Sequence, residues 1–442
     1  MVLTLAEVSK HNSRSSCWVI IRNKVYDVTD FLSEHPGGAK IILKKRTQDE
    51  IRVEKAQQQK PPLNRVLNLS EMEAVAKQVL SYKAWAYYSS AGDDEITHAE
   101  NIRAFSRFFF NARVLRPISR CDTKTTLLGF PSSLPIFVSG AALAKLGHPD
   151  GEANITRGCG RAGIIQMVSS NASLSVEEVA NARVKPDQPI WFQLYKHSDE
   201  KAVERIREIE KLGYGAIFLT VDAPVVGHRE RDIHAPFVLE DQEREAERLA
   251  GQDAQHDLPQ GPEPDEMVEG TAGALLSAVD RDLSWKKTIP WLRSVTRLPI
   301  VIKGIQCVED AVLAAEAGVD GILISNHGGR QLDYSMPSIE VLYRLHKQRP
   351  DIFSKLEVYV DGGARRGTDI LKALCLGAKA VGMGRPFLYA QGAYGDAGVE
   401  RIIRILETEI MLGMRLLGAT CLQELVPEMV ERVDWQPINA RL

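Results

Sequence analysis

The feature that most constrains the fold is a strand-then-helix rhythm that repeats eight times in the larger, C-terminal part of the chain. Short apolar runs alternate with amphipathic stretches such as DEKAVERIREIEKLG (199–213). Continuous apolar runs are typical of strands that are buried on both faces, and the helices between them supply right-handed crossovers. The eight runs are IFVSGAA (136–142), IIQMVSS (164–170), IWFQLY (190–195), AIFLTVD (216–222), IVIKG (300–304), GILISN (321–326), EVYVDGG (357–363) and AVGMGR (380–385).

Eight such units predict the α/β class and a (β/α)₈ TIM barrel. An open doubly wound sheet is the competing architecture, but no GxGxxG follows the first strand. One polar, acidic stretch interrupts the rhythm at residues 236–283, between the fourth and fifth strands. A long insertion inside a compact domain is usually a lid or a disordered loop, and on the catalytic rim of a barrel it would lie close to the substrate.

The remaining segments set the expected domain boundaries. Residues 1–43 contain a strand-like WVIIRNKVYDV, and residues 44–66 are charged, Gln-rich and contain Pro-Pro, as expected of a linker. The barrel is predicted to occupy residues 67–425, followed by a C-terminal tail at 426–442.

Composition excludes several classes of function. A net charge of −3 does not indicate a nucleic-acid-binding protein. No apolar run approaches the roughly 18 residues of a membrane span. Six widely spaced cysteines without a CxxC indicate reduced thiols and not a zinc site or a disulfide framework. No presequence is evident at the N-terminus, and Ala440-Arg441-Leu442 resembles a peroxisomal address. We therefore expect a peroxisomal or cytoplasmic protein in preference to a mitochondrial one.

Polar and titratable groups gather where the predicted strands end. In a barrel the catalytic groups lie at the carboxyl ends of the strands, so these positions are informative. Their number exceeds what structure alone requires. They are Ser139 to Ala142, Ser169, Ser170, Gln193, Tyr195, Thr220, Asp222, Lys303, Ser325 to His327, Asp361 to Gly363, Gly384 and Arg385.

The run His327-Gly-Gly-Arg330 follows a buried strand and places a base beside an anion-binding guanidinium. Asp222, at another strand end, could hold the imidazole. Arg229 in GHRERD supplies a second possible clamp for a carboxylate. The structural alternatives are a histidine satisfied within a turn and two surface arginines, and this motif alone does not choose between them.

Two glycine-rich runs, DGGARRG (361–367) and GMGR (382–385), follow the seventh and eighth strands. Glycines there let backbone N–H groups close on a phosphate, and Arg365 and Arg385 can neutralise it. Tight turns would explain the glycines but not the paired arginines. Lys303 ends a central strand, where its charge could stabilise a reduced cofactor ring.

These motifs resemble the FMN-dependent L-2-hydroxy acid oxidase and dehydrogenase family over about residues 67–425. Within that family the chain is most similar to the flavocytochrome type, L-lactate cytochrome c oxidoreductase, because an HPGG segment precedes the barrel. The matching stretches are WAYYSSAGDDEIT (85–97), FQLY (192–195), LTVDAP with GHRERD (219–232), LPIVIKG (298–304), SNHGGRQLDY (325–334) and DGGARRGTDILKALCLGAKAVGMGRPFLY (361–389).

The resemblance implies a role for each matching residue. His327 would be the active-site base, paired with Asp222, and Tyr195 would bond the substrate hydroxyl. The substrate carboxylate would be held by Arg330 and Arg229, with help from Tyr87. Lys303 would lie beside the flavin N1/C2 carbonyl. The flavin would be lined by Ala141, Ser169, Gln193, Thr220 and Ser325, and its ribityl and phosphate groups would be held by Asp361, Gly362, Gly363, Arg365, Gly384 and Arg385.

Two departures from the family pattern affect these expectations. The first strand ends in SGAA, so position 141 lacks the threonine hydroxyl that is common in the family. The segment SCWVIIRNKVYDVTDFLSEHPGG (16–38) resembles a cytochrome b5-type haem domain with His35 as one axial ligand of the iron. That fold needs a second histidine, yet none occurs between His35 and His98. We therefore expect a truncated haem module and no stoichiometric haem b.

The resemblance implies FMN-dependent oxidation of a small L-2-hydroxy acid, with L-lactate the first candidate, to the 2-oxo acid. Electrons would pass from flavin N5 to oxygen or another acceptor, or through haem to cytochrome c if the N-terminal module works. The Cα hydrogen leaves either as a proton or as a hydride, and the sequence does not decide. An FMN-barrel isomerase and a b5-like module on an inactive barrel are the rival interpretations. Family members are commonly homotetramers.

Overall fold

The computed structural model describes residues 3–34 (without 9, 14, 22 and 23), 46–249, 270–276 and 279–433. The predictions for His35, for most of the middle of the 236–283 insertion and for the C-terminal Ala-Arg-Leu lie outside these residues. None of the described helices has an apolar stretch long enough to cross a membrane.

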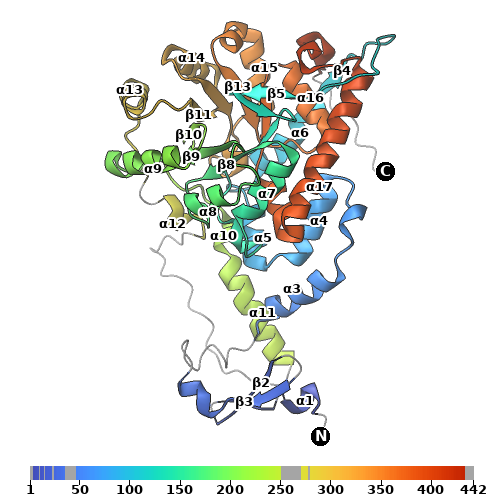
Figure 1. Cartoon of the computed structure of the whole chain (residues 1–442), viewed down its shortest axis with the longest axis vertical. Coiled ribbons are helices and arrows are strands. Elements are labelled where there is room, and N and C mark those ends of the chain that lie inside the picture. The colour runs from blue at the N-terminus through green and yellow to red at the C-terminus, as the bar shows by residue number, and fades with distance from the viewer. Residues whose placement is uncertain are drawn as a thin grey trace.

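Eight parallel strands close into a barrel, and each of them coincides with one of the eight predicted apolar runs, although β11 ends one residue beyond its run (Figure 1). The predicted TIM barrel is therefore confirmed. The strands are β7 (Ile136–Val138), β8 (Ile165–Ser169), β9 (Ile190–Leu194), β10 (Ile217–Thr220), β11 (Ile300–Ile305), β12 (Gly321–Ile324), β13 (Glu357–Asp361) and β14 (Ala380–Met383).

Helices surround the strands and supply the crossovers between them (Figure 1). The crossover helices are α7 (Glu152–Ala162), α8 (Val176–Asn181), α9 (Asp199–Lys211), α13 (Trp285–Val295), α14 (Val308–Glu316), α15 (Ser338–Gln348) and α16 (Gly367–Cys375), and α17 (Arg385–Leu417) follows the last strand. Before the barrel come α4 (Leu69–Val79), α5 (Tyr82–Ser89), α6 (Ile96–Arg103) and the short strands β4 (Phe108–Phe110), β5 (Thr125–Leu127) and β6 (Phe130–Ser132). Near the C-terminus β15 (Val430–Arg432) pairs antiparallel with β4.

Large side chains fill the interior of the barrel toward its amino end. Phe137, Trp191, Phe218 and Tyr359 are fully buried, and their ring centroids lie 5.1 to 6.2 Å apart. Neighbouring residues of the same strands point outward and pack against the helices. Because this layer is apolar and closed, polar chemistry is confined to the carboxyl end of the barrel.

The segment expected to be a linker contains a helix, α3 (Gln48–Gln59), which begins with a capping box formed by Thr47 and Glu50. Arg52 donates to the carbonyls of Gln78 and Leu80, both at 2.7 Å. The backbone N–H of Tyr82 donates to Asp49 at 2.8 Å. These bonds attach α3 to the helices that lead into the barrel, so at least this part of the segment is not a free spacer.

The 236–283 insertion also carries regular structure at its start. Helix α11 (Ala235–Leu249) packs against α3 and α5 and extends from the barrel toward the N-terminal strands (Figure 1). Its run of Glu, Arg and Ala residues has high helix propensity. The chain returns to the barrel as α12 (Gly273–Leu276), and the Asp280 N–H donates to the carbonyl of Lys196 at 2.8 Å.

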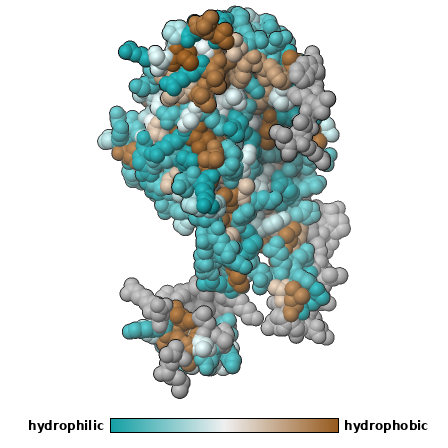
Figure 2. Space-filling view, turned by 90° about the vertical axis from the view of Figure 1, so that its right-hand side faces the viewer, coloured by the Kyte–Doolittle hydropathy of each residue, from teal (hydrophilic) through white to brown (hydrophobic). Residues whose placement is uncertain are grey.

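The N-terminal segment forms a small antiparallel sheet from β1 (Asn12–Ser13), β2 (Ser16–Ile21) and β3 (Lys24–Asp27), next to α1 (Leu5–Val8). Among its described hydrophobic side chains Val8, Cys17 and Leu32 are buried, whereas Ile20, Ile21 and Tyr26 are exposed. Figure 2 shows apolar side chains on the surface of this part of the molecule. The described residues therefore enclose very little core.

Candidate active site

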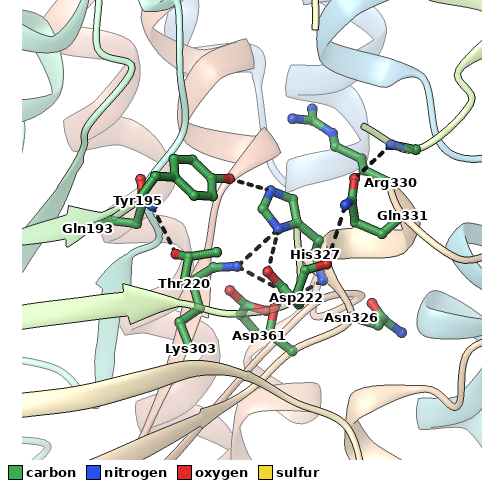
Figure 3. Close-up of polar contacts among 12 residues, drawn as sticks. Gln193, Tyr195, Thr220, Asp222, Lys303, Asn326, His327, Arg330, Gln331 and Asp361 are labelled. Atoms are coloured by element: carbon green, nitrogen blue, oxygen red, sulfur yellow. Dashed lines mark hydrogen bonds and ion pairs between the residues drawn. The ribbon is translucent and has the colours of Figure 1, made fainter. Parts of the chain in front are cut away.

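Four of the predicted catalytic residues, Tyr195, Asp222, Lys303 and His327, meet at the carboxyl end of the barrel, although they belong to or follow four different strands (Figure 3). Thr220 and Lys303 are register partners on β10 and β11, and Asp222 lies two residues beyond Thr220. Tyr195 follows β9, and His327 begins the turn after β12. Closure of the parallel barrel therefore unites residues that are more than 100 positions apart in the sequence.

His327 lies in a tight turn with φ 58°, a left-handed conformation that is unusual for a residue with a side chain. Its neighbour Asn326 stabilises the turn by accepting the Gly329 N–H at 3.2 Å. Asn326 also exchanges two amide hydrogen bonds of 2.8 Å with buried Asn101. Backbone strain of this kind persists only where the surroundings fix it, and it is common at active sites.

Three groups surround the imidazole of His327. Its Nδ1 lies 2.8 Å from Asp222 Oδ1, and its Nε2 lies 3.4 Å from the Tyr195 hydroxyl. Lys303 Nζ donates to Asp222 Oδ2 at 3.2 Å and lies 3.3 Å from Nδ1. An ionised carboxylate can only accept, so Nδ1 carries the proton and the lone pair of Nε2 is left to act as a base.

Electrostatics keep this base neutral and its partner charged. Burial and the positive charge of Lys303 lower the pKa of His327 to about 4, against the opposing effect of Asp222. Burial alone would raise the pKa of Asp222, but the charges of Lys303 and His327 outweigh it and hold the value at about 2. Near neutral pH the pair is therefore an imidazole held by a carboxylate, which is the form a general base requires.

Two guanidinium groups, those of buried Arg229 and half-buried Arg330, lie near His327. Arg229 donates through Nε to the Arg330 carbonyl at 3.3 Å, and Arg330 donates to the Tyr88 carbonyl at 2.5 Å. Arg330 also lies over the ring of Tyr87, 5.7 Å from its centroid, and its Nε has no partner among the described residues. Burial and the charge of Arg330 lower the pKa of Arg229 to about 10. Two such cations side by side favour the binding of an anion such as a substrate carboxylate.

A cavity at the carboxyl end of the barrel begins at His327 and Lys303 and continues toward the ends of β13 and β14. Of the predicted flavin residues, the cavity wall includes Ala141, Lys303, Asp361, Gly362, Gly363, Arg365, Gly384 and Arg385.

The residues of the cavity fit FMN. Asp361 Oδ2 accepts the Ser139 hydroxyl at 2.9 Å, but its buried Oδ1 has no partner among the described residues, as expected of an acceptor for a ribityl hydroxyl. Gly362 and Gly363 both have φ 90°, and a Cβ at Gly363 would lie 2.0 Å from the Asn101 carbonyl oxygen. Only glycine can supply this close backbone approach beside the cavity.

Three of the four other predicted flavin residues form a polar network next to the cavity. Gln193 donates to the Thr220 hydroxyl at 2.9 Å and accepts from Ser169 at 3.1 Å. The Ser325 hydroxyl accepts the His327 N–H at 3.1 Å. The structure thus joins Ser169, Gln193 and Thr220 in one network, and Ser325 supports the His327 turn separately.

The two arginines expected at a phosphate already have protein partners. Arg385 donates to the carbonyls of Tyr88, Ser90 and Gly328 at 2.8 to 3.0 Å, and Arg365 forms an ion pair with Glu73. Their positive charges face the cavity wall as expected. Their sequence motifs gave no indication of these contacts, because the partners lie on α4, α5 and the His327 turn.

His98 was not among the expected site residues, yet it lines the same cavity from α6. Burial and the charge of Arg385 lower its pKa to about 3, so the imidazole is neutral. Gln331 is a second such residue, since its amide donates to the carbonyls of Asp222 and Val225 and joins the two catalytic loops (Figure 3). Neither residue follows a strand directly, so the positions of the strand ends do not point to them.

Comparison with known proteins gives two family matches. Residues 76–432 match the FMN-dependent dehydrogenase family, and residues 4–59 match the cytochrome b5-like haem/steroid binding domain. The second match extends beyond the boundary expected at residue 43 and includes α3. The domain boundaries themselves remain predictions.

Similar proteins include L-lactate dehydrogenase (cytochrome) of Wickerhamomyces anomalus, 41% identical over 97% of this chain and 80% of the relative. The enzyme of the same name from Saccharomyces cerevisiae is 42% identical over 96% and 79%. Glycolate oxidase 1 of Zea mays is 43% identical over 82% of this chain and 95% of its own length. The barrel therefore aligns with both flavocytochrome-like and oxidase-like relatives.

Solved structures agree with this grouping. A double mutant of flavocytochrome b2 with pyruvate bound has a TM-score of 0.77 and 43% identity, covering 89% of this chain and 95% of that one. Mandelate oxidase with benzoyl-formic acid has a TM-score of 0.68 and 32% identity, covering 83% and 98%. By its fold, its cofactor cavity and these matches, the chain belongs to the FMN-dependent dehydrogenase family.

Proposed function

We propose that this protein oxidises a small L-2-hydroxy acid, with L-lactate the first candidate, to the corresponding 2-oxo acid. The observation that carries the proposal is the pairing of the neutral His327–Asp222 base with two neighbouring guanidinium groups, Arg229 and Arg330, beside a cavity whose residues fit FMN. A 2-hydroxy acid offers a carboxylate to the arginines and an acidic hydrogen to the base. The names of the L-lactate and glycolate enzymes among its relatives support this substrate class.

Each residue of the site has a role that follows from its charge and position. Arg229 and Arg330 bind the substrate carboxylate, and the Tyr195 hydroxyl bonds the substrate hydroxyl. Burial raises the pKa of Tyr195, so the phenol keeps its proton and donates. His327 Nε2 takes one proton from the substrate, and Asp222 stabilises the imidazolium that forms. Bound FMN supplies the acceptor for the two electrons that leave the substrate.

The cofactor is assigned to the cavity next to this group. Asp361 and the backbone at Gly362 and Gly363 would hold the ribityl chain, and Arg365 and Arg385 would place positive charge near the phosphate. Lys303 places its charge at the opposite end of the cavity, beside Asp222. A cation there favours negative charge on a reduced cofactor.

The direct test is an anaerobic mixture of the purified protein with L-lactate, glycolate and mandelate in turn. We expect the protein to be yellow, and the absorption band of oxidised flavin to disappear on addition of a 2-hydroxy acid. An isomerase would retain the oxidised band with all three acids. An inactive barrel would carry no flavin band.

For the electron acceptor we propose oxygen or a small soluble acceptor. The alternative is transfer through haem to cytochrome c, which the cytochrome b5-like match over residues 4–59 favours. Against haem, the chain has only His11 and His35 before His98, and the His11 ring is stacked on Trp18 with Nδ1 2.6 Å from the Ser16 hydroxyl. The alignment with the W. anomalus enzyme also runs over 474 positions, more than the 442 residues of this chain, so that relative has residues that this chain lacks.

The visible spectrum separates these acceptors. We expect flavin bands without a stoichiometric Soret band, and formation of hydrogen peroxide during aerobic turnover of L-lactate. A Soret band at one haem per chain, with turnover that depends on cytochrome c, would instead assign the haem route.

We further propose a homotetramer and a peroxisomal or cytoplasmic location. The first is a common property of the family, and the second is supported by the final Ala-Arg-Leu. Light scattering of the purified protein tests the oligomer. A fluorescent fusion with and without the last three residues tests the location.

A further inference from the structure

A buried carboxylate that no step of the mechanism uses lies behind the substrate arginines. Asp232 is on the short helix α10 (Glu230–Ile233), three residues after Arg229, and it is 1% exposed. Its Oδ2 accepts the Ala272 N–H at 3.1 Å. Its Oδ1 is buried without a hydrogen-bond partner among the described residues. A buried carboxylate oxygen left in this state is costly unless a nearby positive charge compensates it.

The charge of Asp232 acts on the substrate-binding group. The negative charge of Asp232 favours the protonated form of Arg229, opposing the repulsion from Arg330, and it also acts on Tyr87. Arg229 is buried, so the repulsion that it experiences from Arg330 is poorly screened. The negative charge of Asp232 is therefore suited to offset this repulsion and to hold Arg229 in position for the substrate carboxylate.

Asp232 also holds the segment that returns from the 236–283 insertion. Besides the bond to Ala272, the backbone at Gly270 comes so close that a Cβ there would lie 2.7 Å from Asp232 Oδ2. The same segment continues to Leu276, which packs with Tyr195 and Ala223. Asp232 thus lies between Arg229, whose carbonyl accepts the Asp232 backbone N–H at 3.0 Å, and the segment that packs against Tyr195.

We propose that Asp232 is a positioning residue that couples binding of the substrate carboxylate at Arg229 to the docking of residues 270–276 against Tyr195. This inference rests on the proposed function, because it takes a carboxylate as the ligand of Arg229. Since the coupling acts through binding, loss of the Asp232 charge should weaken binding of carboxylates more than it slows the chemical step.

The central test uses Asp232→Asn in the FMN-loaded full chain. The amide oxygen can still accept the Ala272 N–H, so the variant removes mainly the charge. We expect the Kd for oxalate, measured by perturbation of the flavin spectrum, and the KM for L-lactate to rise about 10-fold, with kcat within about threefold. Glu230→Gln is the matched control, because it removes an exposed carboxylate from the same short helix. It should leave both constants unchanged.

Two further measurements address the docked segment. Gly270→Ala places a methyl group against Asp232 Oδ2 and should also weaken oxalate binding, which keeps the proposal testable if Asp232→Asn fails to fold. In the wild-type protein, oxalate should slow amide hydrogen exchange at residues 270–276. Any of three results would overturn the proposal. The Asp232→Asn protein could bind oxalate as tightly as wild type, or Glu230→Gln could lose as much oxalate affinity as Asp232→Asn. The third result is an amide exchange rate at 270–276 that does not change when oxalate is added. A wild-type protein that binds oxalate but is not reduced by L-lactate would overturn only the proposed substrate.

Discussion

The carboxyl end of the barrel and the N-terminal sheet differ in how completely the rest of the chain fixes them. At the barrel, the Asp222 side chain is fully buried and the Lys303 side chain is 4% exposed, and each charge has a partner of opposite sign. In the N-terminal sheet, Ile20 and Ile21 are 46% and 54% exposed. Both regions carry a motif of a known cofactor family; the barrel buries and pairs the residues of its motif, whereas the HPGG motif lies outside the described residues. A motif predicts chemistry only where the surrounding fold can hold it.

Among the changes that test this comparison, the largest effect on activity is expected from substitution of His327. Replacing it by Gln should slow reduction of the flavin by L-lactate by about 10³–10⁴-fold, because the general base is lost. Anaerobic stopped-flow absorbance measures the rate, and the flavin content of the variant is the control. A rate within tenfold of wild type would show that the residues at the barrel end are not organised around this base.

Asp222→Asn should have the next largest effect. It removes a charge-assisted hydrogen bond to His327, worth about 1.5–3 kcal/mol, which corresponds to a rate loss of about 10–100-fold. It also leaves Lys303 without its buried anion. Steady-state measurement of kcat and KM shows which constant the substitution changes. We expect a lower kcat, because Asp222 does not face the substrate carboxylate. A change confined to KM would contradict the assigned role.

The pH dependence provides a smaller but sharper test. The active form of His327 is neutral, and its pKa is lowered from the usual value of 6.5 to about 4. Therefore kcat/KM for the 2-hydroxy acid should hold as pH falls through 6.5 and decline only at a lower pH. In Asp222→Asn the midpoint should fall further, since Asp222 raises this pKa. A midpoint of the wild-type kcat/KM profile at pH 6.5 or above would contradict the buried position of the His327 imidazole beside Lys303.

The smallest effect is expected from the N-terminal sheet. Removing residues 1–45 should change flavin content and the rate of reduction by L-lactate by no more than about twofold, because an independent segment contributes little to the stability of a neighbouring domain. Removing residues 1–60 should lower the thermal midpoint of the barrel, since it also deletes α3 with its Arg52 and Asp49 contacts. Equal behaviour of the two truncations would mean that α3 belongs with the sheet and not with the barrel.

The barrel was predictable from the sequence because its signals are local. A strand buried on both faces needs a continuous apolar run, and a residue that follows the run lies at the carboxyl end. Each of the eight predicted runs coincides with a barrel strand, and His327, Asp222 and Tyr195 meet as that rule implies. Helices α3 and α11 escaped prediction since their polar composition is equally typical of a linker or a loop.

The partners of charged groups were not predictable in the same way. Nothing near Lys303 in the sequence indicates that it lies between Asp222 and His327, and nothing near Arg385 indicates three backbone carbonyls. By itself the sequence determined the barrel, the family and the set of residues at its rim, because periodicity and strand ends are properties of neighbouring residues. The tertiary structure decided which charges pair, which oxygen of Asp361 stays open to a ligand and where Asp232 lies, since burial and pairing depend on residues that only folding brings together.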